Sequence, residues 1–331
     1  MASSVNSSSL LCDTSLLETV WWQHTQLLNS ADSELKLDSE VDRAIFDLLG
    51  VSQHQGISAV YENALSFDGF LSHIAKISSF SLLNLNRASA YLNGVNQPAQ
   101  IQQRFDEIAA MPDVLTSEDL QQWQEDGYVI LKEALDLKQC SAVKKAIADF
   151  LSVDLNDSSK WYDLELRAGI MVELIQHPAL TQARNAKRIH KAYSQLWGTE
   201  DLIVSTDRCG FNPPQTHTHP FSGPDLHWDL NLCKPLQLGT QGIVYLTDTA
   251  PEQGALTVVP GFHHQLPKQI KQYVSKQHQI DLHQFGSRAI GANAGDMVIW
   301  HHFLPHGSRP NLTEQPRIVQ YINMYPFPKT R

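Results

Sequence analysis

The chain has no cysteine framework, no excess of positive charge and no long apolar run. Its four cysteines, Cys12, Cys140, Cys209 and Cys233, show no C-x-x-C spacing, so free thiols in a reducing compartment are expected. There are 25 basic and 35 acidic residues, for a formal net charge of −10 at pH 7. This balance argues against a nucleic-acid-binding surface. No apolar run approaches the length of a membrane span, so no membrane partner is expected.

The amino-terminal residues do not lead from a charged segment into an apolar stretch, so no secretory signal peptide is expected. Residues 1–12 are rich in serine and are predicted to be disordered. A cytoplasmic location is predicted, and a plastid location is left open. The 331 residues, 42% of them hydrophobic, suffice for a β-barrel with an accessory unit, while oligomeric state is left unpredicted.

Helical spacing dominates the first third of the chain. Apolar side chains recur at this spacing at Leu16, Leu17, Val20 and Trp21, and again at Ala44, Ile45, Leu48 and Leu49. Gly94 begins a break, and Met111–Asp113 contains a proline and has the composition of a linker. These features predict a helical accessory region over residues 13–112.

Short strands separated by turns follow the linker. Thr116–Asp119 matches a helix capping box, and Gly127 ends that helix ahead of a strand over 128–131. Helices are predicted over 138–151 and 180–197, and further strands over 202–206, 242–247, 255–260, 288–290, 296–301 and 317–324. Such spacing predicts a closed or double-sheet β architecture for residues 113–331.

Three side chains have the chemistry of an iron site. His227 and Asp229 stand at i and i+2, and on a β-strand this spacing would bring both to one face. His306 would reach them from another strand. Two imidazoles and one carboxylate make a three-ligand face for iron(II) and leave positions open for a co-substrate and O₂. Arg317, eleven residues later, offers a planar fork that suits a carboxylate.

Other histidines compete for the same roles. His217 and His219 could form a metal pair, but the chain has no following glutamate of the cupin type, so a structural or substrate-edge loop is favoured. His301 and His302 are alternatives to His306, with one of them expected in the core or on the surface. His263 and His264, after a Pro-Gly turn, are expected to be exposed loop residues.

Two groups of charged residues leave their roles open. Arg184, Lys187, Arg188 and Lys191 share helical spacing and could meet a phosphate, but a solvated helical face is the preferred interpretation. Asp207 and Arg208 stand at the end of a predicted strand, as either a buried structural ion pair or a substrate-orienting pair. Arg309 is expected to lie near the predicted site in sequence only.

The order of the motifs resembles the phytanoyl-CoA dioxygenase family of iron(II)/2-oxoglutarate oxygenases. The matching segments are the H-x-D at 227–229, GALTVVPGFH at 254–263, GDMVI at 295–299, LPHGS at 304–308 and the late Arg317. The resemblance covers roughly residues 114–328. It implies a mainly β catalytic domain with a double-stranded β-helix of the jelly-roll or cupin type, flanked by helices and preceded by the α-helical region.

The resemblance also assigns roles to single residues. It implies that His227, Asp229 and His306 bind iron(II), that Ser308 and Arg317 hold the distal carboxylate of 2-oxoglutarate, and that Gln241 lies near this co-substrate. Where the family usually has a tryptophan two residues after that glutamine, this chain has Ile243, so the packing there is expected to differ. The ligand Asp229 argues against a halogenase, which needs that coordination position for chloride.

The function implied is oxidation of an unactivated C–H bond of a small-molecule metabolite, with release of succinate and CO₂ and with hydroxylation as the default. Two alternatives stay open. One is oxidative cyclisation or desaturation of an amino-acid-derived natural product, as in algal kainoid synthases that resemble this family. The other is a catalytically inert binding protein on the same fold.

Overall fold

The computed structural model describes residues 15–29, 39–61, 66–78, 81–230, 232, 235–276 and 280–328. Contacts divide the chain into two compact units. The first comprises Met1–Met111, Thr199–Thr206 and Pro326–Arg331, and the second Pro112–Gly198 and Asp207–Tyr325. The break at Met111–Pro112 falls in the expected linker. A single boundary at residue 113 does not reproduce this division. Two later segments, Thr199–Thr206 and Pro326–Arg331, group with the helical residues of the first unit.

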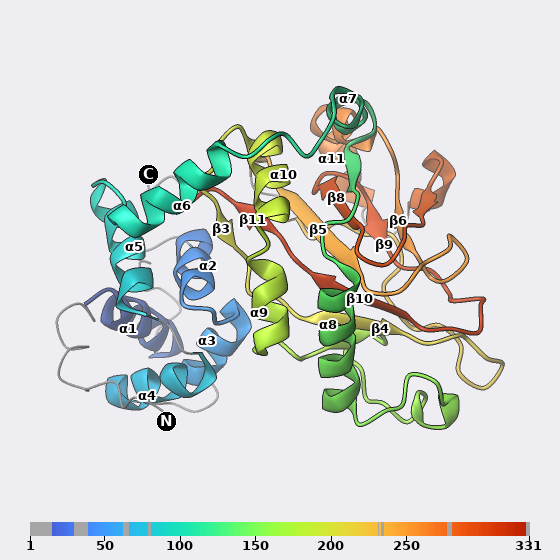
Figure 1. Ribbon diagram of the computed structural model, residues 1–331, viewed down its shortest axis with the longest axis horizontal. Coiled ribbons are helices and arrows are strands. Elements are labelled where there is room, and N and C mark those ends of the chain that lie inside the picture. Colours follow the sequence, from blue (N-terminus) through green and yellow to red (C-terminus); the bar gives the residue numbers. More distant parts are fainter. Residues whose placement is uncertain are drawn as a thin grey trace. The chain divides into compact units, whose positions relative to one another are not determined.

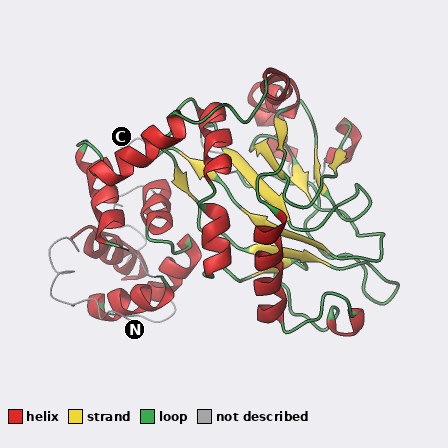
Figure 2. Cartoon of the chain, viewed as in Figure 1, coloured by secondary structure: helices red, strands yellow, loops and turns green. Residues whose placement is uncertain are grey.

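The first unit is built from helices (Figures 1 and 2), which pack around an apolar core. They are α1 Ser15–Asn29, α2 Ser39–Leu48, α3 Gln53–Tyr61, α4 Phe67–Ile77, α5 Leu82–Asn93 and α6 Ala99–Ala109, with the short β3 Ile203–Val204. The expected helical spacing is confirmed, since α1 buries Leu17 and Val20 while α2 buries Ile45 and Leu48. Gly94 ends α5 with φ 62, a left-handed conformation that favours glycine.

The second unit contains two antiparallel sheets (Figure 2). The larger has the order β1-β8-β5-β10-β4-β2 and the smaller the order β7-β6-β9. Their strands are β1 Tyr128–Leu131, β2 Met171–Val172, β4 Cys209–Asn212, β5 Thr240–Tyr245, β6 Leu256–Val258, β7 Arg288–Ile290, β8 Met297–His301, β9 His306–Gly307 and β10 Arg317–Tyr321. Tyr245, Val298 and Val319 of the larger sheet share one core with Leu256 and Val258 of the smaller. We call the side of the larger sheet that carries these residues its inner face.

Two helices of this unit, α9 Pro178–Arg184 and α10 Lys187–Trp197, contact the opposite, outer face of the larger sheet or the segment that follows β10. The other helices of this unit are α7 Ser117–Asp126, α8 Leu137–Leu151 and α11 Leu266–Lys276. Gln320, on the outer face, donates to the carbonyl of Leu180 in α9. Tyr193 of α10 donates to the carbonyl of Ile322 at 2.8 Å. The chain is therefore a mixed helix and sheet protein, and among the described residues the two sheets are not joined into a closed barrel.

Several predicted elements are confirmed and others need correction. The capping box is present, with Asp119 N donating to Thr116 Oγ1 at 3.1 Å and Thr116 N to Asp119 Oδ2 at 2.8 Å. The single helix expected over 180–197 is wrong, because the chain leaves helical geometry between α9 and α10, where Ala186 is extended with ψ 121. The strand over 202–206 shortens to β3, and that over 317–324 splits into β10 and β11 Met324–Tyr325.

No helix in the described part of the chain is long and apolar enough to cross a bilayer.

Candidate metal centre

His227 and Asp229 do not lie on a strand, contrary to the expectation from their spacing. His227 forms an isolated β-bridge with His306 of β9, through His227 N to His306 O at 2.9 Å and His306 N to His227 O at 3.0 Å. The segment before them contains Pro220 and Pro224, which lack the amide hydrogens that a strand ladder needs. A single bridge therefore brings the two histidines side by side.

The three predicted ligands meet at one point. Atoms of His227, Asp229 and His306 that could bind a metal all lie within 4.8 Å of one another. Asp229 Oδ1 is 3.2 Å from His227 Nε2, and Asp229 Oδ2 is 3.3 Å from His306 Nε2. Trp228 turns away, as expected, and its indole donates to the carbonyl of Phe303 at 2.9 Å. The described residues contain no other such group of three or more side chains.

Backbone carbonyls fix the orientation of both imidazoles. His227 Nδ1 lies 2.7 Å from the carbonyl oxygen of Asp225, and His306 Nδ1 lies 3.1 Å from that of Leu304. A carbonyl only accepts, so each Nδ1 carries a proton and each ring directs its Nε2 at Asp229. Nε2 is therefore the atom of each ring that a metal would take, in place of any proton there. This donor set therefore fits iron(II).

The electrostatics of the carboxylate would suit an anionic metal ligand. The hydrogen bond to His227, with a second to His306, holds the pKa of Asp229 far below its usual range. In turn, Asp229 raises the pKa of His227. Asp229 is therefore ionised at neutral pH.

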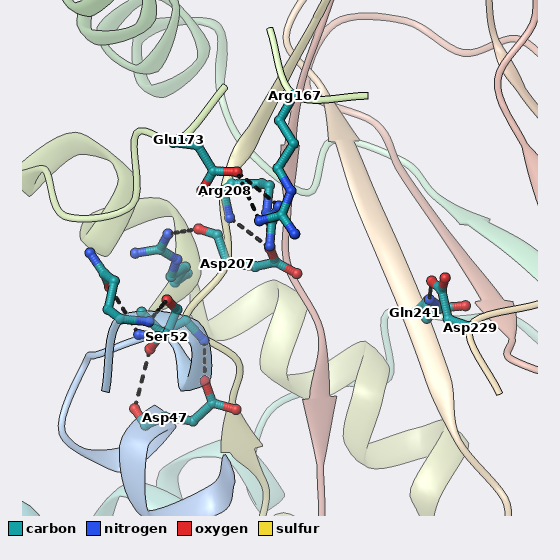
Figure 3. Close-up of polar contacts among 11 residues, drawn as sticks. Asp47, Ser52, Arg167, Glu173, Asp207, Arg208, Asp229 and Gln241 are labelled. Carbon is teal, nitrogen blue, oxygen red and sulfur yellow. Dashed lines mark hydrogen bonds and ion pairs between the residues drawn. The ribbon is translucent and has the colours of Figure 1, made fainter. Parts of the chain in front are cut away.

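Gln241 of β5 orients the carboxylate. Its Nε2 donates to Asp229 Oδ2 at 2.6 Å, and its Oε1 accepts from Trp300 Nε1 at 3.1 Å. Since an indole nitrogen only donates, Trp300 determines which end of the amide faces Asp229. The close-up in Figure 3 shows the contact between Gln241 and Asp229. The structure thus places Gln241 against a ligand of the candidate metal.

Arg317 is a buried cation that could bind an anionic ligand. The side chain is 1% exposed, lies on the inner face at the start of β10 and pairs in register with Asn212. Among the described residues its Nε and Nη2 have no hydrogen-bond partner. A buried charge without a partner is strongly unfavourable, and a ligand carboxylate would satisfy both atoms. Ser308, 7% exposed, follows β9 and its amide donates to the carbonyl of Pro224.

Sequence reasoning missed a second layer behind His227. The carboxylate of Asp225, whose carbonyl accepts from His227, lies 2.7 Å from His283 Nε2. His283 Nδ1 contacts Ser287 Oγ at 2.8 Å, and Arg309 donates to the same hydroxyl at 2.7 Å. Arg309 therefore lies close to the candidate centre in space, and not in sequence only. The position of Arg309 directly after the LPHGS segment was the only sequence signal for this layer of contacts.

The backbone of β9 lies very close to this layer. A Cβ built on Gly307 would lie 2.6 Å from the carbonyl carbon and oxygen of Asp225. Only a residue without a side chain allows this approach.

The remaining predicted histidines lie elsewhere. His301 and His302 are partly buried at the end of β8, and His302 Nε2 contacts the carbonyl of Gln237. His219 stacks on Tyr162 with a centroid separation of 4.7 Å, which agrees with a loop role. His263 is partly buried against the carbonyl of Gln124, so its expected exposure is wrong.

The basic helix is not a single solvated face. Arg184 and Lys191 are 6% and 7% exposed, Arg184 donates to the carbonyl of Asp207, and Lys191 lies 3.5 Å from Asp113. Two of the four cations, Arg184 at the end of α9 and Lys191 in α10, are thus buried instead of facing solvent.

Two of the cysteines, Cys140 and Cys209, are free and buried, as expected. Burial raises the pKa of the Cys209 thiol to about 12, so it stays protonated. Cys12 and Cys233 lie outside the described residues.

A family model described as phytanoyl-CoA dioxygenase (PhyH) matches residues 123–319. The match spans more than half of the chain and contains every residue of the candidate centre. The chain belongs to the phytanoyl-CoA dioxygenase family. It is a dioxygenase that uses iron(II) with 2-oxoglutarate as co-substrate, which confirms the predicted class and cofactors.

Individual proteins that resemble this chain share less than a quarter of their aligned residues with it. A Dictyostelium discoideum protein described as "Putative phytanoyl-CoA dioxygenase" is 23% identical over 253 residues, 60% of this chain and 72% of that protein. The 2-oxoglutarate-dependent carbocyclase SnoK from nogalamycin biosynthesis aligns with a TM-score of 0.47 and 21% identity over 63% of this chain and 83% of its own. HygX from Streptomyces hygroscopicus, solved with nickel and 2-oxoglutarate, aligns at 0.46 and 17%, over 64% and 87%.

Proposed function

We propose that this dioxygenase oxidises an unactivated C–H bond of a small-molecule metabolite, with hydroxylation as the default outcome. His227, Asp229 and His306 hold the iron(II). Arg317 at the start of β10 and Ser308, which follows β9, bind the 5-carboxylate of 2-oxoglutarate. When bound, the metal and co-substrate supply the oxidising chemistry, while the protein orients the target bond and excludes water.

The observation that carries this proposal is the presence of two complementary sites in one unit. The Nε2 atoms of His227 and His306 converge on the carboxylate of Asp229, so these three groups can hold one metal ion. Arg317 presents two buried donors without an anion. A divalent metal satisfies the first, and a dicarboxylate that reaches from the metal along the inner face satisfies the second. Gln241 then acts as a positioning residue for Asp229.

The finer fold is part of the same proposal. The larger and smaller sheets correspond to the two walls of a double-stranded β-helix that begins near residue 113, with the helical residues before it as an accessory region. The core shared by the two sheets supports this interpretation.

A succinate-release assay tests the function. Purified protein with iron(II), 2-oxoglutarate and O₂ is incubated with amino-acid derivatives, terpenoids and acyl-CoAs, and the products are weighed by mass spectrometry. A gain of about sixteen mass units, one inserted oxygen atom, identifies hydroxylation, and a loss of about two, the removal of two hydrogens, identifies desaturation or cyclisation. Absence of any 2-oxoglutarate turnover, in a sample shown to bind iron(II), would contradict the proposal.

A further inference from the structure

A row of charged side chains lies on the inner face at the free edge of the larger sheet. The register of β2 against β4 pairs Met171 with Gly210 and Val172 with Cys209, so the next pair is Glu173 with Arg208. The amide of Tyr321 donates to the carbonyl of Arg208, which places Arg208 opposite Tyr321. Residues directly opposite in antiparallel strands point to the same side. Arg208 and Glu173 therefore share the inner face with Tyr321 and Arg317.

Four side chains make this row an ion-pair cluster (Figure 3). Arg208 Nη1 is 2.9 Å from Glu173 Oε1, and Arg167 Nη1 is 3.7 Å from the same oxygen. Arg208 Nε is 3.3 Å from Asp207 Oδ1. The two cations and two anions balance, so the cluster has no formal net charge.

These contacts leave donors and acceptors for a ligand. Both arginines use Glu173 Oε1, and neither contact involves Oε2. The contacts of Arg208 with Glu173 and Asp207 use Nη1 and Nε, and neither involves Nη2. The side chains of Arg208 and Glu173 are 25% and 43% exposed, so a ligand can reach them. The pair thus offers a planar donor edge next to a carboxylate oxygen.

The cluster lies within reach of the candidate metal centre. Tyr321 pairs with Ile243 of β5 on one side and Arg208 on the other, so Arg208 and Ile243 are separated by two strand spacings, about 10 Å. Gln241, which bonds Asp229, is two residues from Ile243 on the same face. Beside Arg208 on the same face, Gly210 carries no side chain, and a Cβ there would lie 3.5 Å from the Tyr321 ring.

Electrostatics place Tyr321 between the two groups. Burial raises the pKa of its phenol, Arg317 and Arg208 lower that pKa, and Asp207 and Asp229 raise it. Tyr321 is thus near enough to both Asp229 and the ion-pair cluster to feel the charges of each.

We propose that Arg208 and Glu173 bind the head group of an α-amino-acid substrate, with the carboxylate on Arg208 and the ammonium on Glu173. A lone carboxylate would add net negative charge to a balanced cluster, whereas a zwitterion matches both signs and keeps the balance. The substrate side chain then extends from Arg208 past Tyr321 toward β5 and the metal ligands. Arg208 and Glu173 determine specificity and take no part in the chemistry. The inference rests on the proposed function, because it names the substrate class of the same site.

The test uses the full-length protein with zinc(II), which is redox-inactive, and saturating 2-oxoglutarate. The probes are the proteinogenic L-amino acids, their methyl esters, and the 2-hydroxy acids that replace the ammonium by a hydroxyl. Binding is measured by saturation-transfer NMR, and succinate release is measured separately with iron(II). The variants are Arg208→Gln, Arg208→Lys and Glu173→Gln. Lys145→Gln, which breaks an exposed ion pair to Asp149 on α8, is the matched control.

At least one L-amino acid is expected to bind the wild-type protein and to stimulate succinate release. Arg208→Gln and Glu173→Gln should each weaken its binding about tenfold to a hundredfold, the usual cost of one charge-assisted hydrogen bond, while Lys145→Gln leaves it unchanged. Arg208→Lys should recover part of the affinity, since it restores the charge without the fork. The ester and the hydroxy acid should bind as weakly as the variants do.

Other outcomes overturn the inference. If no amino acid binds a protein that binds 2-oxoglutarate normally, the cluster is structural and the proposed function stands. Equal binding of the hydroxy acid removes Glu173 from recognition, and unchanged affinity in Arg208→Gln removes Arg208. If the wild-type protein fails to bind 2-oxoglutarate at all, the proposed function and the inference both fail.

Discussion

The two units each contain a histidine, an aspartate and a glutamine in contact, and the two sets differ in every property that matters for a metal. In the first unit, His24 Nε2 lies 3.0 Å from Asp42 Oδ2, to which Gln23 also donates at 3.1 Å. His24 is 6% exposed and Asp42 1%. In the second unit, His227, Asp229 and Gln241 are joined by a second histidine, and the Asp229 side chain is 55% exposed.

The difference shows that residue type alone does not make a metal site. The site must also be accessible to the metal, and the imidazole nitrogens must point toward the carboxylate. The pair in the first unit has one imidazole and is closed off within a helical core. The centre in the second unit has two imidazoles whose Nδ1 atoms are occupied by carbonyls, so both Nε2 atoms converge on an accessible carboxylate. The same three residue types therefore stabilise a fold in one place and can hold iron in the other.

Removing a ligand should have the largest effect. His306→Ala and Asp229→Ala should each abolish iron(II) binding and turnover, because two donors do not hold the metal face that three provide. Anaerobic titration with iron(II), together with succinate release, measures both. Full activity in either variant would show that the ligands have been misassigned.

Arg317 comes next, because its loss affects the co-substrate alone. Arg317→Ala should weaken 2-oxoglutarate binding by about 3–5 kcal/mol, the cost of removing one partner from a buried charge pair. Arg317→Lys should recover only part of the loss, since a point charge cannot reproduce the fork. Calorimetric titration of the zinc(II)-loaded protein measures the affinity, and iron(II) binding serves as control. An unchanged affinity would assign Arg317 to structure.

The buried pair of the first unit should respond in the opposite way. His24→Ala should lower the free energy of unfolding by about 3 kcal/mol, because it leaves Asp42 buried without its imidazole. Iron(II) affinity should not change. Denaturant unfolding and metal titration on one preparation give both quantities. A loss of iron binding without a loss of stability would reverse the roles given to the two sets.

The smallest effect concerns a histidine outside both sets. Burial, with nearby His302, His263 and His264, lowers the pKa of His301 to about 3 from 6.5. A depressed pKa means that the unfolded chain binds the proton first, so stability is complete above about pH 6.5 and is lost as pH falls toward about 3. Between about pH 7 and about pH 5 this group accounts for about 2 kcal/mol.

His301→Asn should therefore flatten the dependence of unfolding free energy on pH in that range, as measured by denaturant titration at several pH values. His217→Asn, an exposed loop substitution, is the control and should leave the slope as it is. Equal slopes in the wild type and His301→Asn would rule out His301 as the group responsible.

The sequence predicted which side chains lie together at the candidate centre, but not the backbone geometry that presents them. His227, Asp229, His306 and Arg317 could be named because iron and carboxylate chemistry needs particular side chains, and the structure brings the first three together. The strand expected beneath the H-x-D motif was wrong, since prolines in the approaching segment prevent a ladder and a single bridge replaces it.

The contacts that support His227 could not be predicted from the sequence, for a different reason. Asp225, His283 and Arg309 come from three separated segments, and only tertiary packing joins them. The same holds for Glu173 and Arg208, whose pairing depends on the register of a two-residue strand. Helical spacing in the first unit was predicted well because local periodicity is sufficient there.

Gly307 has a consequence for anyone who wishes to redesign this protein. Because β9 touches the carbonyl that orients His227, position 307 has no room for even a methyl group, and a library randomised there should return glycine almost exclusively. Diversity aimed at new substrates is better placed at positions 173 and 208, where the edge of the sheet can accept new side chains and leave the spacing of the ligands intact.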